Sequence, residues 1–291
     1  MIGRALTVAL GADAYHCQAH LSENLHYQAD HPRVGELFVK VYADEERCRR
    51  EGLVLDLLGP SHDWVIPPRY EGVLPDGEHF RAFSRHSMRP FVLDPGGCRW
   101  AGRILAELHG TAWGPSSGAA VELPPTEPGW RVIDQRLEKL RQWPEPYREA
   151  VRIAGEAAPL LRALDARAPG QVLLSGDFGA RNLHVRQDND SPVLLDFERA
   201  MLGDPHWDLG KLWDQGMSEP TQRTAFLRGY REAGGRRWFP DRTALWATRF
   251  AAASGIFPYA SRVGDTAFFQ HGIQKLSLLS AELPGVLATI D

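Results

Sequence analysis

The residues VLLSGDFGARNLHVRQDNDSPVLLDFERAMLGDPHWDL, at positions 172–209, decide the fold of this 291-residue chain. Short apolar runs alternate in this stretch with polar turns, which predicts short strands joined by loops. Asp177, Asn182 and Asp196 lie in the turns, next to the ends of the expected strands. Loops held by a rigid sheet often carry catalytic side chains, so these three residues are candidates for a site.

Asp177, Asn182 and Asp196 together supply the groups that phosphoryl transfer requires. One carboxylate can accept a proton, while a second carboxylate and an amide oxygen can hold a divalent cation. Each residue alone would also suit an ordinary turn, because Asp and Asn populate turns for conformational reasons. The agreement of several spaced elements favours a site over that reading.

The spacing of this stretch resembles that of the aminoglycoside phosphotransferases and their choline-kinase-like relatives, which are small-molecule kinases. Their catalytic loop typically reads His-Gly-Asp-x-x-x-x-Asn, and their metal-binding acid is followed later by Gly-Asp-Pro-x-x-Asp-Leu. The matching residues are Gly176, Asp177, Asn182, Asp196, Gly203, Asp204, Pro205, Asp208 and Leu209. Ser175 departs from the pattern by replacing the usual His. Glu198 stands where protein kinases carry the Gly of Asp-Phe-Gly, which disfavours a protein kinase.

The resemblance implies an α+β class, with a bilobal protein-kinase-like fold. An amino-terminal lobe at 1–86 would hold an antiparallel sheet and one helix, and would bind the nucleotide. A larger, mostly helical lobe at 87–291 would carry the catalytic loop within 172–209. Its acceptor-binding subdomain would comprise about 115–170 and 206–291.

The run LFVKVY at 37–42 predicts a strand with Lys40 in its middle. A lysine there loses hydration, and a nearby counter-ion is needed to offset the free-energy cost of burying its charge. The acid-rich helix expected next contains Glu51, which the resemblance pairs with Lys40 against the nucleotide's α- and β-phosphates. Glu46 is a rival partner, and a surface lysine that snorkels into water is the alternative reading.

Two hairpins are expected to complete the nucleotide site. A strand, turn and strand at 15–42 would cover the phosphates, with Ser22 and Asn24 as candidate ligands, although a plain turn without that role remains the alternative. A second hairpin at 65–86 leads to Ser84 and His86, where the resemblance implies the hinge that binds adenine. Further helices are expected at 97–112, 130–142, 146–165 and from 207 to the end.

The resemblance also implies roles in the catalytic stretch. Asp177 would orient the acceptor hydroxyl and accept its proton. Asn182 and Asp196 would hold Mg²⁺ against the phosphates of ATP or GTP. Arg181 could approach the transferring group or form a surface salt bridge. Three further residues are read as structural supports, namely His109, Asp204 and Asp208.

The composition excludes several classes of protein. A net charge of −4 argues against general nucleic-acid binding. Three scattered cysteines offer no disulfide framework or metal-ligand spacing, and they indicate a reducing compartment. No apolar run reaches membrane-spanning length, and the amino terminus lacks a clear targeting pattern. We therefore expect a cytoplasmic protein, a monomer or weak dimer, that does not bind membranes.

The expected activity is transfer of a γ-phosphoryl group to a hydroxyl of an antibiotic-like small molecule. A metabolic kinase for an amino alcohol, sugar or nucleoside is the alternative within kinases, and a nucleotide-binding pseudokinase is an alternative without turnover. A hydrolase with an aspartate nucleophile would leave Lys40 and Glu51 unexplained. Residues 115–170 hold eight acidic and eight basic residues, and residues 206–291 hold eight and ten. This balance favours a weakly charged acceptor over a strong polycation.

Overall fold

The computed structural model describes residues 1–17, 24–59, 61–113, 129–166, 171–237 and 239–289. It divides into two compact units, each of which is described by itself. The first comprises Met1–Val92 and Ser175–Ala200 with the described part of 111–123, and the second comprises Leu93–Gly110, the described part of 124–174 and the residues from Met201 onward. Residues 175–200 of the catalytic stretch thus group with the amino-terminal residues, and the lobe boundary expected at residue 86 stays a prediction.

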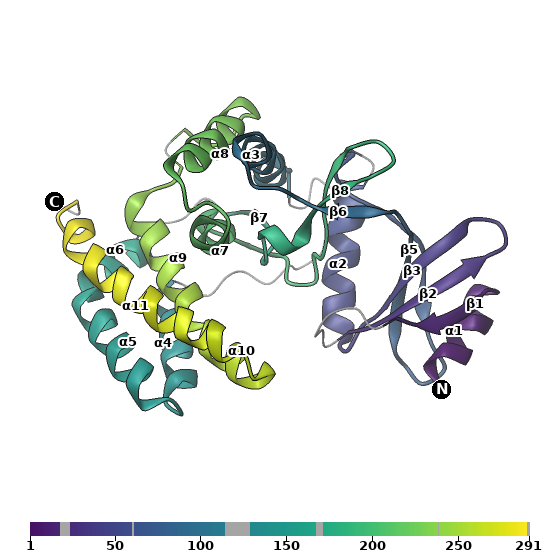
Figure 1. Cartoon of the computed structure of the whole chain (residues 1–291), viewed down its shortest axis with the longest axis horizontal. Coiled ribbons are helices and arrows are strands. Elements are labelled where there is room, and N and C mark those ends of the chain that lie inside the picture. Colours follow the sequence, from purple (N-terminus) through teal and green to yellow (C-terminus); the bar gives the residue numbers. More distant parts are fainter. Residues whose placement is uncertain (18–23, 60, 114–128, 167–170, 238, 290–291) are drawn as a thin grey trace. The chain divides into compact units, whose positions relative to one another are not determined.

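A five-stranded antiparallel sheet forms the body of the first unit, in the order β1-β2-β3-β5-β4 (Figure 1). The strands are β1 (Asp13–His16), β2 (Leu25–His31), β3 (Gly35–Val41), β4 (Pro68–Val73) and β5 (His79–Ser84). Both expected hairpins are confirmed, with β4 and β5 joined by a turn in which Gly77 has a φ of 92°. Strand β1 begins two residues before the expected start at Tyr15, and residues 18–23, including Ser22, lie outside the described residues.

Alternation along β3 separates the core from the site. Leu37, Val39 and Val41 share one face and pack with α1 (Ile2–Leu10) in an apolar core. Lys40 points to the opposite face. There α2 (Glu45–Leu58) begins at Asp44, whose side chain accepts a hydrogen bond from the Glu46 backbone N–H. Helix α1 was not predicted, so the expectation of one helix in this part of the chain was incomplete.

The catalytic loop of the first unit lies beside a second, three-stranded sheet, in the order β6-β8-β9. Its strands are β6 (Met88–Pro90), β8 (Leu183–Arg186) and β9 (Pro192–Leu194), and the 3₁₀ turn η2 (Ala180–Asn182) leads into β8. Gly176 has a φ of 74°, and a Cβ atom there would lie 1.9 Å from the Arg199 carbonyl oxygen. Only glycine therefore fits the turn directly before Asp177.

Helices make up most of the second unit, together with a two-stranded sheet of β7 (Val172–Leu174) and β10 (Met201–Gly203) (Figure 1). The helices are α3 (Pro95–Gly110), α4 (Gly129–Leu140), α5 (Pro144–Glu156), α6 (Ala158–Ala166), α7 (His206–Gln215), α8 (Pro220–Glu232), α9 (Arg242–Ser254), α10 (Ile256–Val263) and α11 (Thr266–Leu287). They confirm the helices expected near 97–112 and 130–142, whereas the single helix expected at 146–165 is divided into α5 and α6. Strand β10 was not predicted.

The second unit contains a close helix pair and a separate apolar core. Helices α3 and α8 pack closely because glycines meet backbone, since a Cβ at Gly102 would lie 2.1 Å from the Phe226 carbonyl oxygen. A separate apolar core joins α4, α5 and α6 to α9, α10 and α11 around Trp246, Phe250 and Phe257.

Within the described residues of the whole chain, none of the helices has the length and hydropathy needed to cross a bilayer.

Candidate active site

Lys40 is buried among three carboxylates of the first unit. Its Nζ lies 2.8 Å from Glu51 Oε2, 2.8 Å from Asp196 Oδ1 and 3.1 Å from Glu198 Oε2. Burial alone would lower the pKa of Lys40, but these carboxylates outweigh it and hold the pKa well above its ordinary value. The lysine therefore stays charged, and the surface-lysine reading of the sequence is wrong.

Glu51 is held in place by several donors. Besides Lys40, Oε2 accepts a hydrogen bond of 2.6 Å from the Tyr42 hydroxyl, and Oε1 accepts one of 3.2 Å from the Phe197 backbone N–H. Burial, with the nearby Glu51 carboxylate, raises the pKa of Tyr42, so the hydroxyl remains a donor. The backbone bond ties α2 directly to the turn that carries Asp196.

Glu46, the rival partner of Lys40, belongs to the helix surface instead. Its carboxylate bonds Arg49 at 2.7 Å and Arg50 at 2.9 Å on its own helix. Hydrogen bonds from Arg49 and Arg50 hold the pKa of Glu46 at about 2. The structure thus resolves the choice that the sequence left open, in favour of Glu51.

Asp196 and Glu198 follow β9 in a tight turn. Asp196 has a φ of 68°, a left-handed conformation that costs a non-glycine residue about 1–3 kcal/mol and that clusters at functional sites. Glu198 is 6% exposed and was not assigned to the site from the sequence. A signal was present, because a second acid two positions after Asp196 replaces a glycine of the protein-kinase pattern.

Asp177 is enclosed by its own loop and is only 3% exposed. Its Oδ2 accepts a hydrogen bond from the Arg181 guanidinium, and its backbone carbonyl accepts one of 2.8 Å from Asn182 Nδ2. Its backbone N–H donates to Ser175 Oγ at 3.2 Å. The serine that replaces the usual histidine therefore supplies a hydrogen bond within the loop.

The side-chain amide of Asn182 is held by its nitrogen. Because Nδ2 donates to the Asp177 carbonyl, Oδ1 is the other end of the amide. The Leu195 backbone N–H donates to the Asn182 carbonyl oxygen at 2.9 Å, which brings Asn182 beside the turn of Asp196. The two expected metal ligands thus lie at adjoining strand ends, Asn182 directly before β8 and Asp196 two residues after β9.

The charges near Lys40 fit a divalent cation. Three carboxylates surround one ammonium group, and Arg47 NH1 lies 3.6 Å from Glu198 Oε1. Hard carboxylate and amide oxygens suit Mg²⁺, which keeps several water ligands and needs few protein ligands. Among the described residues no ready-made group of three His, Cys, Asp or Glu side chains is spaced to hold a metal. The fit therefore rests on Asp196, Asn182 and a bound phosphate together.

The other residues expected to bind nucleotide are engaged with protein neighbours. Asn24 Nδ2 donates to Glu198 Oε2 at 2.5 Å. Ser84 Oγ accepts from Arg69 Nε at 2.9 Å. His86 Nδ1 lies 3.7 Å from Asp188 Oδ2, and burial, with Arg186, lowers the pKa of His86. All the expected site residues that are described lie in the first unit.

The residues read as structural supports lie in the second unit. Asp204 accepts hydrogen bonds from the backbone and the Nδ1 of His206, and His206 Nε2 accepts from the Asp241 backbone N–H at 2.8 Å. His109 Nδ1 lies 3.0 Å from the Tyr230 hydroxyl, and its Nε2 lies 3.5 Å from Asp208 Oδ2. These contacts join α3, α7 and α8.

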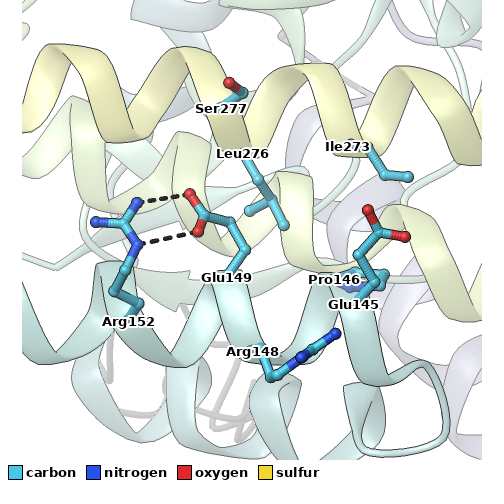
Figure 2. Close-up of a pocket in the computed structure, with 8 residues that line it drawn as sticks. All are labelled: Glu145, Pro146, Arg148, Glu149, Arg152, Ile273, Leu276 and Ser277. Carbon is cyan, nitrogen blue, oxygen red and sulfur yellow. Dashed lines mark hydrogen bonds and ion pairs between the residues drawn. The ribbon is translucent and has the colours of Figure 1, made fainter.

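A pocket of about 470 Å³ lies between α5 and α11 of the second unit (Figure 2). Figure 2 shows two carboxylates and two guanidinium groups along it, from Glu145, Glu149, Arg148 and Arg152. Arg152 NH2 bonds Glu149 Oε1 at 2.6 Å, so charge is matched within the pocket wall. None of the residues expected from the sequence to bind nucleotide or metal lines it.

Comparisons with known proteins agree with this geometry. A family model described as the phosphotransferase enzyme family matches residues 19–246. No curated protein matches the sequence. Among solved structures, the chain is similar to APH(2")-IIia, solved with GDP and kanamycin, with a TM-score of 0.70 and 14% identity over 92% of this chain and 93% of that one.

Two other solved structures represent different relatives. The macrolide 2'-phosphotransferase MphH from Brachybacterium faecium gives a TM-score of 0.60 and 22% identity over 93% of this chain and 96% of that one. The choline kinase LicA from Streptococcus pneumoniae gives a TM-score of 0.66 and 15% identity over 95% and 97%. These likenesses establish a bilobal, protein-kinase-like α+β fold.

Proposed function

Because this chain belongs to the phosphotransferase enzyme family, we propose that it moves the γ-phosphoryl group of ATP or GTP to a hydroxyl of a small molecule. The contact that carries the proposal is that of Lys40 with both Glu51 and Asp196, each at 2.8 Å. Phosphoryl transfer in kinase-like sites needs the lysine–glutamate pair and the metal-binding aspartate together. This arrangement also disfavours the pseudokinase alternative.

Asp177 is the proposed catalytic residue. Its carboxylate orients the acceptor hydroxyl and accepts the proton as the new O–P bond forms, a contribution of about 10²–10⁴-fold in rate. Asn182 supports this step by holding the Asp177 backbone through the 2.8 Å bond to its carbonyl oxygen. A fixed carboxylate loses less free energy to orientation at the moment of reaction.

Asp196 and Asn182 are the proposed ligands of Mg²⁺, and Glu198 is a further oxygen donor beside them. When bound, Mg²⁺ neutralises negative charge on the phosphates. With nucleotide bound, the Lys40 ammonium group would pair with the α- and β-phosphates as well as with Asp196, while its ion pair with Glu51 would keep it in place. Ser84 and His86 remain candidates for the adenine or guanine edge, and Ser22 for the phosphates.

The proposed acceptor is antibiotic-like and carries few positive charges. A desolvated polycation needs acidic residues that have no other partner. In the helical part of the chain, acids are paired with arginines instead, as in Glu149 with Arg152 and Glu282 with Arg249. The relatives solved with known acceptors include one in complex with spectinomycin and one with kanamycin. A neutral or weakly basic hydroxyl compound fits this chain better than kanamycin does.

The test is an acceptor panel with ATP and GTP, read by mass spectrometry as the addition of one phosphoryl group. The panel contains macrolides, nucleosides, spectinomycin, kanamycin, choline and simple sugars. We expect turnover of a weakly charged compound that changes little with ionic strength. Salt-sensitive turnover of kanamycin would refute the acceptor proposal, because surface ion pairs weaken as salt screens them.

Two other outcomes would change the assignment. Turnover restricted to choline, a sugar or a nucleoside would make the chain a metabolic kinase. Tight nucleotide binding without transfer to any compound, and without nucleotide hydrolysis, would favour the pseudokinase. The wild-type protein and a variant lacking the Asp177 carboxylate should be compared in every assay, since the variant supplies the background.

A further inference from the structure

Asn24 links the start of β2 to the turn after β9. It is 5% exposed, and both polar ends of its side chain are engaged. Nδ2 donates to Glu198 Oε2 at 2.5 Å, while Oδ1 accepts from the Ala43 backbone N–H at 3.1 Å. An amide engaged at both ends is poorly placed to become a direct phosphate ligand.

Glu198 connects Asn24 to Lys40 because it contacts both side chains. Its Oε2 accepts the Asn24 hydrogen bond and also lies 3.1 Å from Lys40 Nζ, while Oε1 lies 3.6 Å from Arg47 NH1 on α2. The glutamate is buried, so each of these contacts is worth more than it would be at the surface. One carboxylate thus joins two strands and a helix around the ammonium group.

We propose that Asn24 is a positioning residue, which acts through Glu198 to hold Lys40 where nucleotide phosphates bind. This inference rests on the proposed phosphotransferase function and adds a role for a residue that the sequence suggested as a phosphate ligand. The Asn24 hydrogen bond fixes the rotamer of Glu198 and partly compensates the negative charge of its carboxylate. Without it, Glu198 turns between Lys40 and Arg47, and only Glu51 and Asp196 still fix the position of the lysine.

A swap of the two side chains tests the link. Asn24→Asp places a second carboxylate against Glu198 and removes the donor, whereas Glu198→Gln sets two amides together. In the double variant the direction of this hydrogen bond is reversed, because the amide at position 198 donates to the carboxylate at position 24, but no carboxylate is left at position 198 to face Lys40. Asn189→Asp is the matched control, because it adds the same charge to an exposed turn of the same unit.

The probe is ADP, titrated calorimetrically in EDTA, so that a direct effect of Glu198 on a metal ion does not enter. We expect Asn24→Asp to weaken ADP binding about tenfold, the scale of one hydrogen bond to a charged group. Because both substitutions act on the same contact, their effects on ADP binding should be less than additive in the double variant. In turnover, Asn24→Asp should raise the nucleotide KM more than it lowers kcat.

The outcomes separate this inference from the function on which it rests. Unchanged ADP binding in Asn24→Asp, or additive effects of the two substitutions, would overturn the positioning role. The latter result would indicate that Asn24 touches phosphate directly. If Asn24→Asp does not fold, Asn24→Ala, Glu198→Ala and their double variant give the coupling instead, and additive effects would refute it. Failure of the wild type to bind ADP or ATP would overturn the proposed function as well.

Discussion

The Arg181 guanidinium donates a hydrogen bond to Asp177 Oδ2 within the catalytic loop, four residues apart. The two side chains differ in exposure, since that of Asp177 is 3% exposed and that of Arg181 is 60% exposed. The buried carboxylate therefore has an exposed cation as its partner. If Asp177 accepts the proton of the acceptor, Arg181 stands beside the hydroxyl and the transferring phosphoryl group.

Arg181→Gln tests whether this pair is more than a surface salt bridge. We expect kcat to fall about tenfold, because a hydrogen bond to a charged group contributes about 1.5–3 kcal/mol. Arg181→Lys should retain part of the rate, since it keeps the charge but loses the fork of donors. Arg186→Gln is the control, because Arg186 forms an exposed pair with Asp188 in the neighbouring turn. Equal rates in the wild type and Arg181→Gln would leave Arg181 as a surface residue.

Asp177→Ala should abolish transfer while nucleotide binding stays near that of the wild type. The proposed base contributes about 10²–10⁴-fold and does not hold the nucleotide. Asp177→Asn keeps the shape and should be nearly as inactive, because an amide cannot accept the proton. Single-turnover kinetics and an ATP titration measure the two properties separately. Substantial transfer by either variant would remove Asp177 from this role.

Asp196→Ala should weaken nucleotide binding far more in Mg²⁺ than in EDTA. The proposed ligand acts through the metal ion, so titrations of ATP in Mg²⁺ and in EDTA should converge for this variant and differ for the wild type. Asp188→Ala removes an exposed turn acid and serves as the control. An unchanged affinity for Mg·ATP in Asp196→Ala would show that the metal assignment is wrong.

The need of Lys40 for an acid on the next helix could be predicted from local physics, whereas the choice of Glu51 over Glu46 came from the family resemblance. A lysine within a β-branched strand needs an anion, and the helix that follows β3 brings Glu51 to it only 11 residues later. The short strands and the turn at Gly176 were also predictable, since apolar runs and turn residues are local signals. Side-chain direction then follows from strand alternation.

The Asn24–Glu198 contact could not be predicted in this way. It joins residues 174 positions apart, and its geometry depends on the left-handed backbone at Asp196. Helix α1 was missed for a different reason. Its first residue has no side-chain cap from Met1, and it is stabilised by packing Leu6 and Leu10 against the sheet, which is a tertiary effect.

His109 should make the stability of the chain sensitive to acid. Burial lowers the pKa of His109 below its ordinary value of 6.5. The unfolded chain therefore takes up the proton first as pH falls, so the stability present above about 6.5 declines toward the folded-state pKa. His109→Gln should flatten this decline in Tm, compared with His184→Gln on an exposed side chain. Parallel pH profiles for wild type and His109→Gln would contradict the assignment.

A buried charge network crosses three helices of the second unit. Arg249 Nε donates to Asp214 Oδ1 at 2.8 Å, and NH1 donates to Glu282 Oε2 at 2.6 Å. Lys275 Nζ lies 3.4 Å from Asp214 Oδ2. Burial lowers the pKa of Lys275, and Asp214 opposes that shift. Asp214 thus compensates two buried cations, one on α9 and one on α11.

Asp214→Asn should therefore destabilise the chain by about 3 kcal/mol, because removal of one charge leaves its buried partners uncompensated. Urea unfolding should show a larger loss at neutral pH than near pH 10, at roughly the ordinary pKa of lysine. The sign follows from Lys275, whose pKa is lowered in the folded state, so its proton is lost more readily there and stability rises with pH below 10.5.

Adding Lys275→Met to Asp214→Asn should recover part of the stability, since it removes one of the two buried cations that Asp214 no longer compensates. Glu149→Gln, which breaks an exposed pair with Arg152, should cost less than about 1 kcal/mol. Equal losses from Asp214→Asn and Glu149→Gln would mean that the network contributes no more than a surface pair.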